Sequence, residues 1–327
     1  PSARWAATCT ARGTSPSFPS PIDRLRPWHR ARRCGCLRRV ASPKKSAPRK
    51  HRGGLDFEPL SADLAYRLTA PLRAYFSPRF YGLQRIPRDR PTLLVGNHTI
   101  YGMLDPVLMG VEIYKRRGVM IRGLADHLHF AIPGWRDLLR QMGAVDGTRE
   151  NCHALMRAGE TVLVFPGGGR EVAKRKGEQY RLMWTERTGF VRLAIQHRYT
   201  ITPFASVGPD DAYTILIDAD DVMHTPLWSM LRRTSFAHDL LRDGDSIMPI
   251  ARGLGLSPVP RPDRVDFAVG EPIDTAPYDG HHRSRRVLME VRDRVESAVA
   301  GEITRLQKRR RRDHEQGTLR RLLTKFG

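Results

Sequence analysis

The chain has 327 residues, of which 40% are hydrophobic, so it can bury the core of one α/β domain while leaving long segments at both ends outside that core. Its formal net charge of +22 is uneven: residues 1–53 hold net +13, residues 282–327 hold net +8, and residues 54–281 are nearly neutral at +1. No run of 18 or more apolar residues occurs, which argues against a membrane-spanning helix, and basic ends without interleaved aromatic side chains argue against specific nucleic-acid binding.

Residues 1–53 are rich in Pro, Ser, Ala and Arg, a composition typical of a disordered segment. They lack the apolar stretch of a secretory signal peptide, so we interpret them either as upstream sequence outside the native protein or as an organelle-targeting leader. Three of the four cysteines, Cys9, Cys34 and Cys36, lie here, and the fourth is Cys152. We therefore expect no structural disulfide and a location that faces the cytosol.

Residues 60–83 mix apolar side chains with Arg67, Arg73 and Arg79 at helical spacing. Two interpretations stay open: a helix that lies on or slightly in a bilayer, and an ordinary amphipathic helix that covers a sheet.

Strand and helix patterns then alternate along the chain. Strands are predicted near 92–96, 119–123, 161–165 and 200–204, helices near 104–116, 134–142, 149–158 and 187–197, and edge strands at 213–217 and 264–270. This alternation predicts an α/β fold with a mixed, largely parallel central sheet flanked by helices, whose ligands bind at the carboxyl ends of the strands.

The first of these strands ends in Gly96-Asn97-His98, and Asp105 follows seven residues after the histidine. An imidazole takes up a proton near neutral pH, and a carboxylate beside it fixes its tautomer, so the pattern suits a general base. On an ideal helix, seven residues place the two side chains about 10 Å apart along the axis. Either the intervening residues loop out or another group is the partner of His98.

A second strand ends in Phe165-Pro166-Gly167-Gly168-Gly169-Arg170-Glu171. Glycines at a strand end leave backbone amides open to a ligand, and an arginine supplies a forked cation that holds phosphate or carboxylate. We interpret this block as the floor of a substrate site.

Two later segments carry charge. The acidic residues Asp218, Asp220 and Asp221 with His224 predict a solvated loop, and we expect no metal site there or elsewhere. From Leu288 to Leu306, apolar residues recur at three- and four-residue steps and lead into a basic run at 308–312 and a basic, apolar tail at 319–326. The helix either packs on the core or lies on an anionic bilayer surface together with the tail.

Over residues 57–275 the chain resembles the glycerolipid O-acyltransferase superfamily, which includes the lysophosphatidate acyltransferases and is marked by a His-x4-Asp block and a later Phe-Pro-Glu-Gly-x-Arg block. The likeness is strongest to its neutral-lipid branch, the phytyl ester synthases and diacylglycerol acyltransferase-like proteins. It is carried by segments 165–171, 176–180 and 190–192, and by Pro203-Phe204 and Val207-Gly208.

The resemblance implies catalytic roles for His98 and Asp105, and an acceptor site formed by Asn97, Pro166 and Gly167–Glu171, with Arg149 from a second family block that includes Gly143. Gly167 stands where the lysophosphatidate enzymes carry Glu, which favours a neutral hydroxyl as acceptor.

The expected organisation is a leader (1–53), an acyltransferase domain (54–281) and a basic C-terminal helix with its tail (282–327). The expected activity moves a fatty acyl group from acyl-CoA or acyl carrier protein to diacylglycerol or a long-chain alcohol, with no cofactor, peripherally on the cytoplasmic face of a membrane. A lysophosphatidate or lysophospholipid acyltransferase and a non-catalytic lipid-binding protein remain as alternatives, and the sequence leaves the oligomeric state open.

Overall fold

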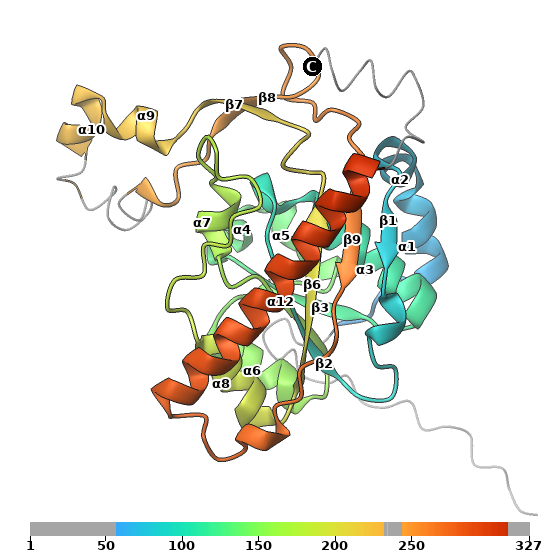
Figure 1. Cartoon of the computed structure of the whole chain (residues 1–327). Coiled ribbons are helices and arrows are strands. Elements are labelled where there is room, and N and C mark those ends of the chain that lie inside the picture. Colours follow the sequence, from blue (N-terminus) through green and yellow to red (C-terminus); the bar gives the residue numbers. More distant parts are fainter. Residues whose placement is uncertain (1–56, 232–233, 235–243, 313–327) are drawn as a thin grey trace, which may run out of the picture. The chain divides into compact units, whose positions relative to one another are not determined.

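The computed structural model of the chain describes residues 57–231, 234 and 244–312, all of which belong to one compact unit, Lys50–Gly327 (Figure 1). The predicted leader and the tail at 319–326 lie outside these residues. A seven-stranded sheet in the order β1-β9-β6-β2-β5-β3-β4 forms the centre. Its strands are β1 (Arg79–Tyr81), β2 (Thr92–Gly96), β3 (Ile121–Ala125), β4 (Val145–Asp146), β5 (Thr161–Val164), β6 (Thr200–Val207) and β9 (Asp266–Val269).

Every pair of neighbouring strands is parallel except β6 and β9, which run antiparallel. The prediction of a mixed, largely parallel sheet is therefore confirmed. Strands β2 and β6 are buried at every position, as expected of a sheet with helices on both faces.

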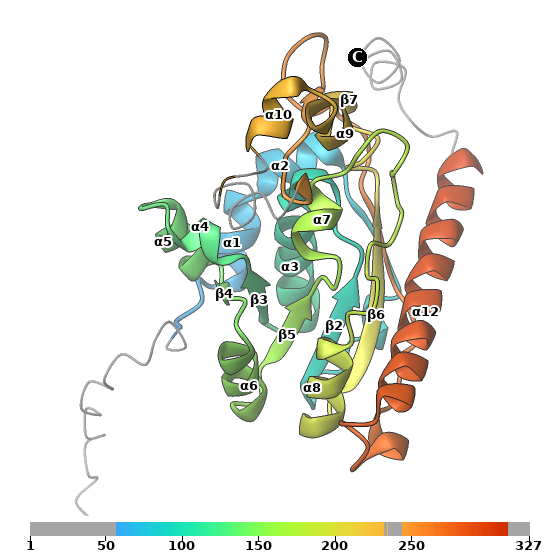
Figure 2. The ribbon, with the colours of Figure 1, turned by 90° about the vertical axis from the view of Figure 1, so that its left-hand side faces the viewer.

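Helices cover the two faces of the sheet (Figure 2). The helices that accompany the central sheet are α1 (Ala62–Leu68), α2 (Ala70–Phe76), α3 (Leu104–Arg117), α4 (His127–Phe130), α5 (Trp135–Gln141), α6 (Arg149–Arg157), α7 (Gly168–Val172), α8 (Gly189–His197) and α12 (Arg285–Arg312). On one face, α12 contributes Val291, Val295 and Val299 to a core shared with α6 and α8. On the other, Leu108 of α3 and Phe76 of α2 belong to a second core. The four-residue spacing of the valines is the helical period that the sequence predicts.

The segment 60–83 differs from its prediction, because it is not one helix. Pro71 starts a second helix at α2, Ser77 ends that helix in the left-handed region with φ of 41°, and Pro78 follows. The chain then forms β1 and the short 3-10 turn Leu83–Arg85. Strand β1, which the sequence did not predict, is an edge of the sheet.

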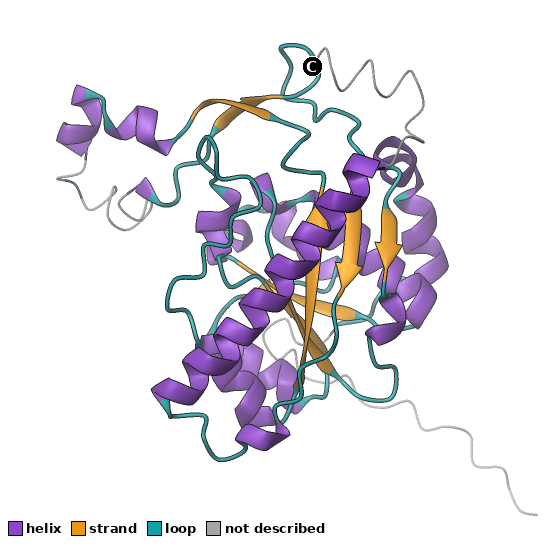
Figure 3. Cartoon of the chain, in the orientation of Figure 1, coloured by secondary structure: helices purple, strands orange, loops and turns teal. Residues whose placement is uncertain are grey.

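The two strands that we predicted at the sheet edge are placed differently. Strand β9 lies inside the sheet, between β1 and β6. Strand β7 (Thr214–Ile217) leaves the central sheet and pairs antiparallel with β8 (Ile250–Arg252) (Figure 3). Between them lie α9 (Ala219–Met223) and α10 (Pro226–Leu231).

The acidic run is not a solvated loop. Asp218 is buried and caps α9, and its carboxylate accepts hydrogen bonds from the amides of Asp220 and Asp221. The Asp221 carboxylate in turn accepts a hydrogen bond from the Asp218 amide, which completes a capping box. Within the described residues, no helix is long and apolar enough to cross a membrane.

Candidate active site

His98 and Asp105 meet because the chain between them loops out. Residues 100–102 form a 3-10 turn in which Tyr101 and Gly102 have φ of 61° and 63°, and α3 then starts at Leu104. As a result, His98 Nδ1 lies 2.8 Å from Asp105 Oδ2, and the Thr99 amide donates to the same oxygen at 3.2 Å. The Asp105 side chain is fully buried. A carboxylate in this position holds the proton on Nδ1 and leaves Nε2 free to accept one.

The imidazole of His98 is also fixed from its sides. It stacks on the Phe165 ring with centroids 3.7 Å apart and planes within 5° of parallel. Gly102 leaves the space that Nε2 needs, since a Cβ at that position would lie 2.6 Å from it. The ring is 15% exposed, so a substrate group can reach it.

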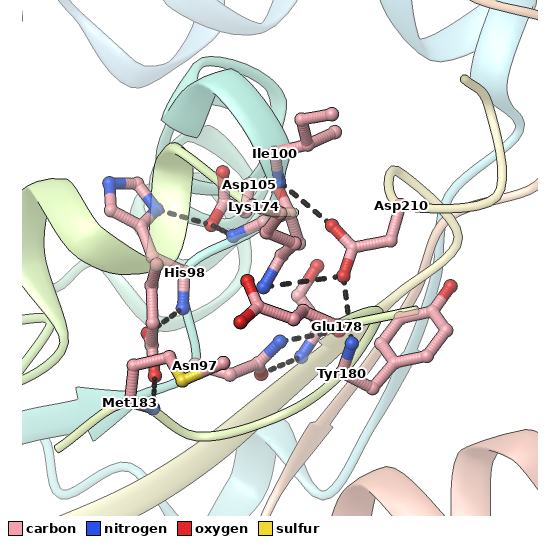
Figure 4. A network of polar contacts seen from close by, with 12 residues as sticks. Asn97, His98, Ile100, Asp105, Lys174, Glu178, Tyr180, Met183 and Asp210 are labelled. Atoms are coloured by element: carbon pink, nitrogen blue, oxygen red, sulfur yellow. Dashed lines mark hydrogen bonds and ion pairs between the residues drawn. The ribbon is translucent and has the colours of Figure 1, made fainter. Parts of the chain in front are cut away.

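The Glu171 carboxylate binds the backbone amide of His98. This carboxylate is fully buried and accepts the His98 amide at 2.8 Å and the Met183 amide at 2.9 Å; dashed lines mark the bonds of these two amides in Figure 4. Burial raises the pKa of Glu171, and the charge of Lys174 opposes this shift. Gly167 is needed here, because a Cβ on it would lie 2.2 Å from Glu171 Cδ. Both oxygens of the Glu171 carboxylate therefore accept backbone amides, and the side chain positions the backbone of His98.

A second buried carboxylate, Asp210, holds the other side of the His98 turn (Figure 4). It accepts the Ile100 amide at 2.8 Å and the Tyr180 amide at 3.0 Å, and Lys174 Nζ lies 3.5 Å from it. Burial raises the pKa of Asp210 as well. Sequence reasoning missed Lys174 and Asp210, because a single Lys and a single Asp after a strand look like surface residues. Among the segments that carry the resemblance, Val207-Gly208 lies next to Asp210, and segments 165–171 and 176–180 flank Lys174.

The guanidinium of Arg170 already has a partner within the protein. It forms a forked pair with Glu178 at 2.9 and 2.5 Å, and Asp245 lies 3.5 Å from its Nε. The hydrogen bond to Glu178 is the main reason that the pKa of Arg170 is raised. The carbonyls of Pro166 and Gly167 accept from Arg187 at 2.9 and 2.7 Å. The glycine block is thus braced by side chains of its own chain, and Gly168 and Gly169 open α7.

Asn97 and Arg149 lie away from the imidazole. The Asn97 amide is buried and makes both of its bonds, at 2.9 Å each, with the backbone of Ser206, which ties β2 to β6. Arg149 is exposed at the start of α6, after β4. Strands β5 and β3 separate β4 from β2, a distance of about 14 Å at the usual strand spacing. The structure therefore brings His98, Asp105 and the glycine block together, and does not bring Arg149 to them.

Comparisons with known proteins find similar acyltransferases. Residues 77–207 match the family described as Acyltransferase. Phytyl ester synthase 2, chloroplastic, of Arabidopsis thaliana is 31% identical over 252 residues, covering 74% of this chain and 36% of that protein. The DGAT1/2-independent enzyme synthesizing storage lipids of Homo sapiens is 35% identical over 123 residues, or 38% of this chain and 37% of that one. The chain thus spans about a third of the length of these relatives.

Among solved structures, the 1-acyl-sn-glycerophosphate acyltransferase of Thermotoga maritima matches with 16% identity and a TM-score of 0.40, over 72% of this chain and 78% of that one.

Proposed function

The chain belongs to the glycerolipid acyltransferase superfamily, and on this basis we propose that it moves a fatty acyl group from a thioester donor to the hydroxyl of a neutral lipid. The observation that carries the proposal is the His98–Asp105 pair, with its 2.8 Å bond at Nδ1 and a partly exposed ring. The donor is acyl-CoA or an acyl carrier protein, and the reaction needs no cofactor.

In this reaction His98 Nε2 takes the proton of the acceptor hydroxyl while the hydroxyl oxygen attacks the thioester carbonyl carbon. The imidazolium that forms is stabilised by the buried Asp105 carboxylate. The tetrahedral intermediate then collapses, the carbon–sulfur bond breaks, and the leaving thiolate takes the proton from the imidazolium. An ester and a free thiol result, without a covalent acyl-enzyme.

A neutral acceptor is favoured by the charges around the site. Three cations in and just after the glycine block have an acidic partner: Arg170 pairs with Glu178, Lys174 with Asp210, and Arg175 with Asp220. A phosphorylated acceptor that bound one of these cations would draw it from its acidic partner, at a cost in free energy. A hydroxyl on diacylglycerol or on a long-chain alcohol makes no such demand.

The test is acyl transfer from radiolabelled palmitoyl-CoA and palmitoyl carrier protein by the full chain in liposomes. The acceptors are diacylglycerol, a long-chain alcohol, lysophosphatidate and a lysophospholipid. We expect ester formation with a neutral acceptor, and a loss of about 10²- to 10⁴-fold in His98→Ala and in Asp105→Asn, because each removes part of the general base. His281→Ala, at an exposed histidine, is the matched control.

Equal turnover by His98→Ala and wild type would refute the base. Product with lysophosphatidate alone would reassign the acceptor to phospholipid synthesis. No product with any acceptor, together with retained lipid binding, would favour the non-catalytic lipid-binding protein.

A further inference from the structure

Three successive backbone amides of the turn that carries His98 donate to three different buried carboxylates. The pairs are His98 with Glu171 at 2.8 Å, Thr99 with Asp105 at 3.2 Å, and Ile100 with Asp210 at 2.8 Å. The carboxylates come from α7, from α3 and from the loop after β6. Residues 98–100 are therefore fixed by acids from three separate segments of the chain.

Glu171 and Asp210 use both of their oxygens on backbone amides. The second oxygen of Glu171 accepts the Met183 amide at 2.9 Å, and the second oxygen of Asp210 accepts the Tyr180 amide at 3.0 Å. A carboxyl group that takes up a proton becomes a donor at one oxygen, which weakens one of its two amide bonds. Both groups therefore hold the turn at full strength only while they are ionised.

Burial works against this ionised state. It raises the pKa of Glu171 and the pKa of Asp210, because a carboxylate in the protein interior loses the solvation that it has in water. For both groups, the largest influence that lowers the pKa is the charge of Lys174. Asp211 adds to the raised pKa of Asp210, and a charge on His98 lowers the pKa of Glu171 to a smaller extent. The ionised state of both carboxyl groups thus depends chiefly on one lysine.

Lys174 is placed to serve both carboxylates. It lies three residues after Glu171, it is 2% exposed, and its Nζ is 3.5 Å from Asp210 Oδ2, a contact that Figure 4 marks with a dashed line. A buried ammonium is costly unless acids neutralise it, so the lysine and the carboxylates stabilise one another. Arg170 and Arg175, on either side of Lys174 in the sequence, bind other acids and do not take its place.

We propose that Lys174 is a positioning residue of the active site: its ammonium keeps Glu171 and Asp210 ionised, and through them it fixes the backbone of residues 98–100. Without this charge, at least one of the two carboxyl groups is protonated at neutral pH and loosens the amide that it held. The imidazole of His98 then loses its alignment with Asp105. The effect of Lys174 on the rate rests on the proposed function, whereas its effect on the charge of the two carboxyl groups does not.

The first measurement is the pH profile of kcat for acyl transfer to the best neutral acceptor, between about pH 6.5 and pH 9. Lys174→Met removes the charge and keeps most of the side-chain length, and Lys176→Met is the matched control at an exposed lysine two residues away. We expect Lys174→Met to lose about 10²-fold in kcat at pH 7, because a displacement of about 1 Å costs that much. Relative to wild type, this variant recovers about tenfold or more toward pH 9, because a buried carboxyl without a cation ionises only at about pH 8–9. Lys176→Met keeps the rate and the profile of wild type.

The second measurement detects the charge of the carboxyl groups directly and needs no acyl transfer. It is the infrared C=O stretching band of protonated carboxyl groups, recorded on the full chain at pH 7 with folding checked by circular dichroism. We expect a stronger band in Lys174→Met than in wild type and in Lys176→Met, and we expect Glu171→Gln or Asp210→Asn to remove the added part. Wild type alone keeps the test decisive if Lys174→Met does not fold. A band in wild type that Glu171→Gln or Asp210→Asn removes would show that Lys174 does not keep both groups ionised.

The results that overturn the proposal are distinct from those that overturn the proposed function. A rate of Lys174→Met that is lower by the same factor at every pH would assign the lysine a packing role only, and a wild-type rate would leave it no role. An infrared band that is unchanged in folded Lys174→Met would also overturn the proposal, even where acyl transfer is found. If no acceptor is acylated, the proposed function fails, while a stronger band in Lys174→Met still supports the role of Lys174.

Discussion

Alanine at Gly102 places a methyl group against the atom of His98 that takes the proton in the proposed reaction. The new Cβ would lie 2.6 Å from Nε2 and 2.7 Å from a methyl group of Val172. Gly118 offers a matched control in the same region of backbone conformation. Its φ of 70° is close to the 63° of Gly102, and a Cβ there meets no atom of the described residues within 4 Å.

The two substitutions share one cost and differ in another. Each forces an alanine into the left-handed region, which costs about 1–2 kcal/mol of unfolding free energy. Only the Cβ at position 102 also presses on the imidazole, which must move by about 0.8 Å for the contact to lengthen from 2.6 Å to an ordinary 3.4 Å. Stacking on Phe165 and the bond to Asp105 oppose this movement. A misplacement of about 1 Å costs on the order of 10²-fold in rate.

The assay compares kcat with the best neutral acceptor and the unfolding free energy from urea titration, for both variants and wild type. We expect Gly118→Ala to lose stability and keep its rate, and Gly102→Ala to lose at least as much stability and about 10²-fold in kcat. If both variants turn over equally fast, Nε2 of His98 is not the atom that accepts the proton.

Three further predictions concern buried groups. Because burial raises the pKa of Glu171 above its usual 4.5, its carboxyl favours the folded state most below pH 4.5, and this contribution declines as the pH rises toward the higher folded pKa. The unfolding free energy of wild type relative to Glu171→Gln, measured by urea titration across that interval, should therefore fall with pH; a rise would contradict the direction of the shift. Burial raises the pKa of Cys152 to about 11, so at pH 8 iodoacetamide should modify this thiol about 100-fold more slowly in the native protein than in denaturant, as followed by peptide mass spectrometry. Arg310 lies 3.0 Å from Asp266 and is largely buried, so Arg310→Met should lower the unfolding free energy by roughly 3 kcal/mol, whereas a matched Arg311→Met at an exposed position should leave it unchanged; equal values would show that the ion pair does not hold α12.

Periodicity accounts for most of the fold that could be predicted. The valines of α12 indicate which face of that helix is buried, because a helix repeats every 3.6 residues whatever it packs against. The unbroken apolar run of β2 indicates a strand that is buried on both faces. The prediction failed where short elements follow one another. In residues 60–83, helical spacing continued across Pro71 and Pro78, and these prolines set the real boundaries.

The candidate site was partly predictable for a similar reason. His98 and the glycine block each follow a strand, and the carboxyl ends of parallel strands meet at one edge of the sheet. The contacts of the polar side chains around them were not predictable. Asn97 uses its amide on Ser206, and Arg170 uses its fork on Glu178.

The sequence by itself thus determined the α/β class, the two strand-end motifs and the family to which they belong, because each is written in neighbouring residues. Only the tertiary structure decided that Asp105 reaches His98 across a left-handed turn, and that Glu171 and Asp210 hold the backbone of that turn. The physical reason is that a buried carboxylate must find its hydrogen-bond donors wherever the fold brings them, and here the donors come from segments far apart in the chain.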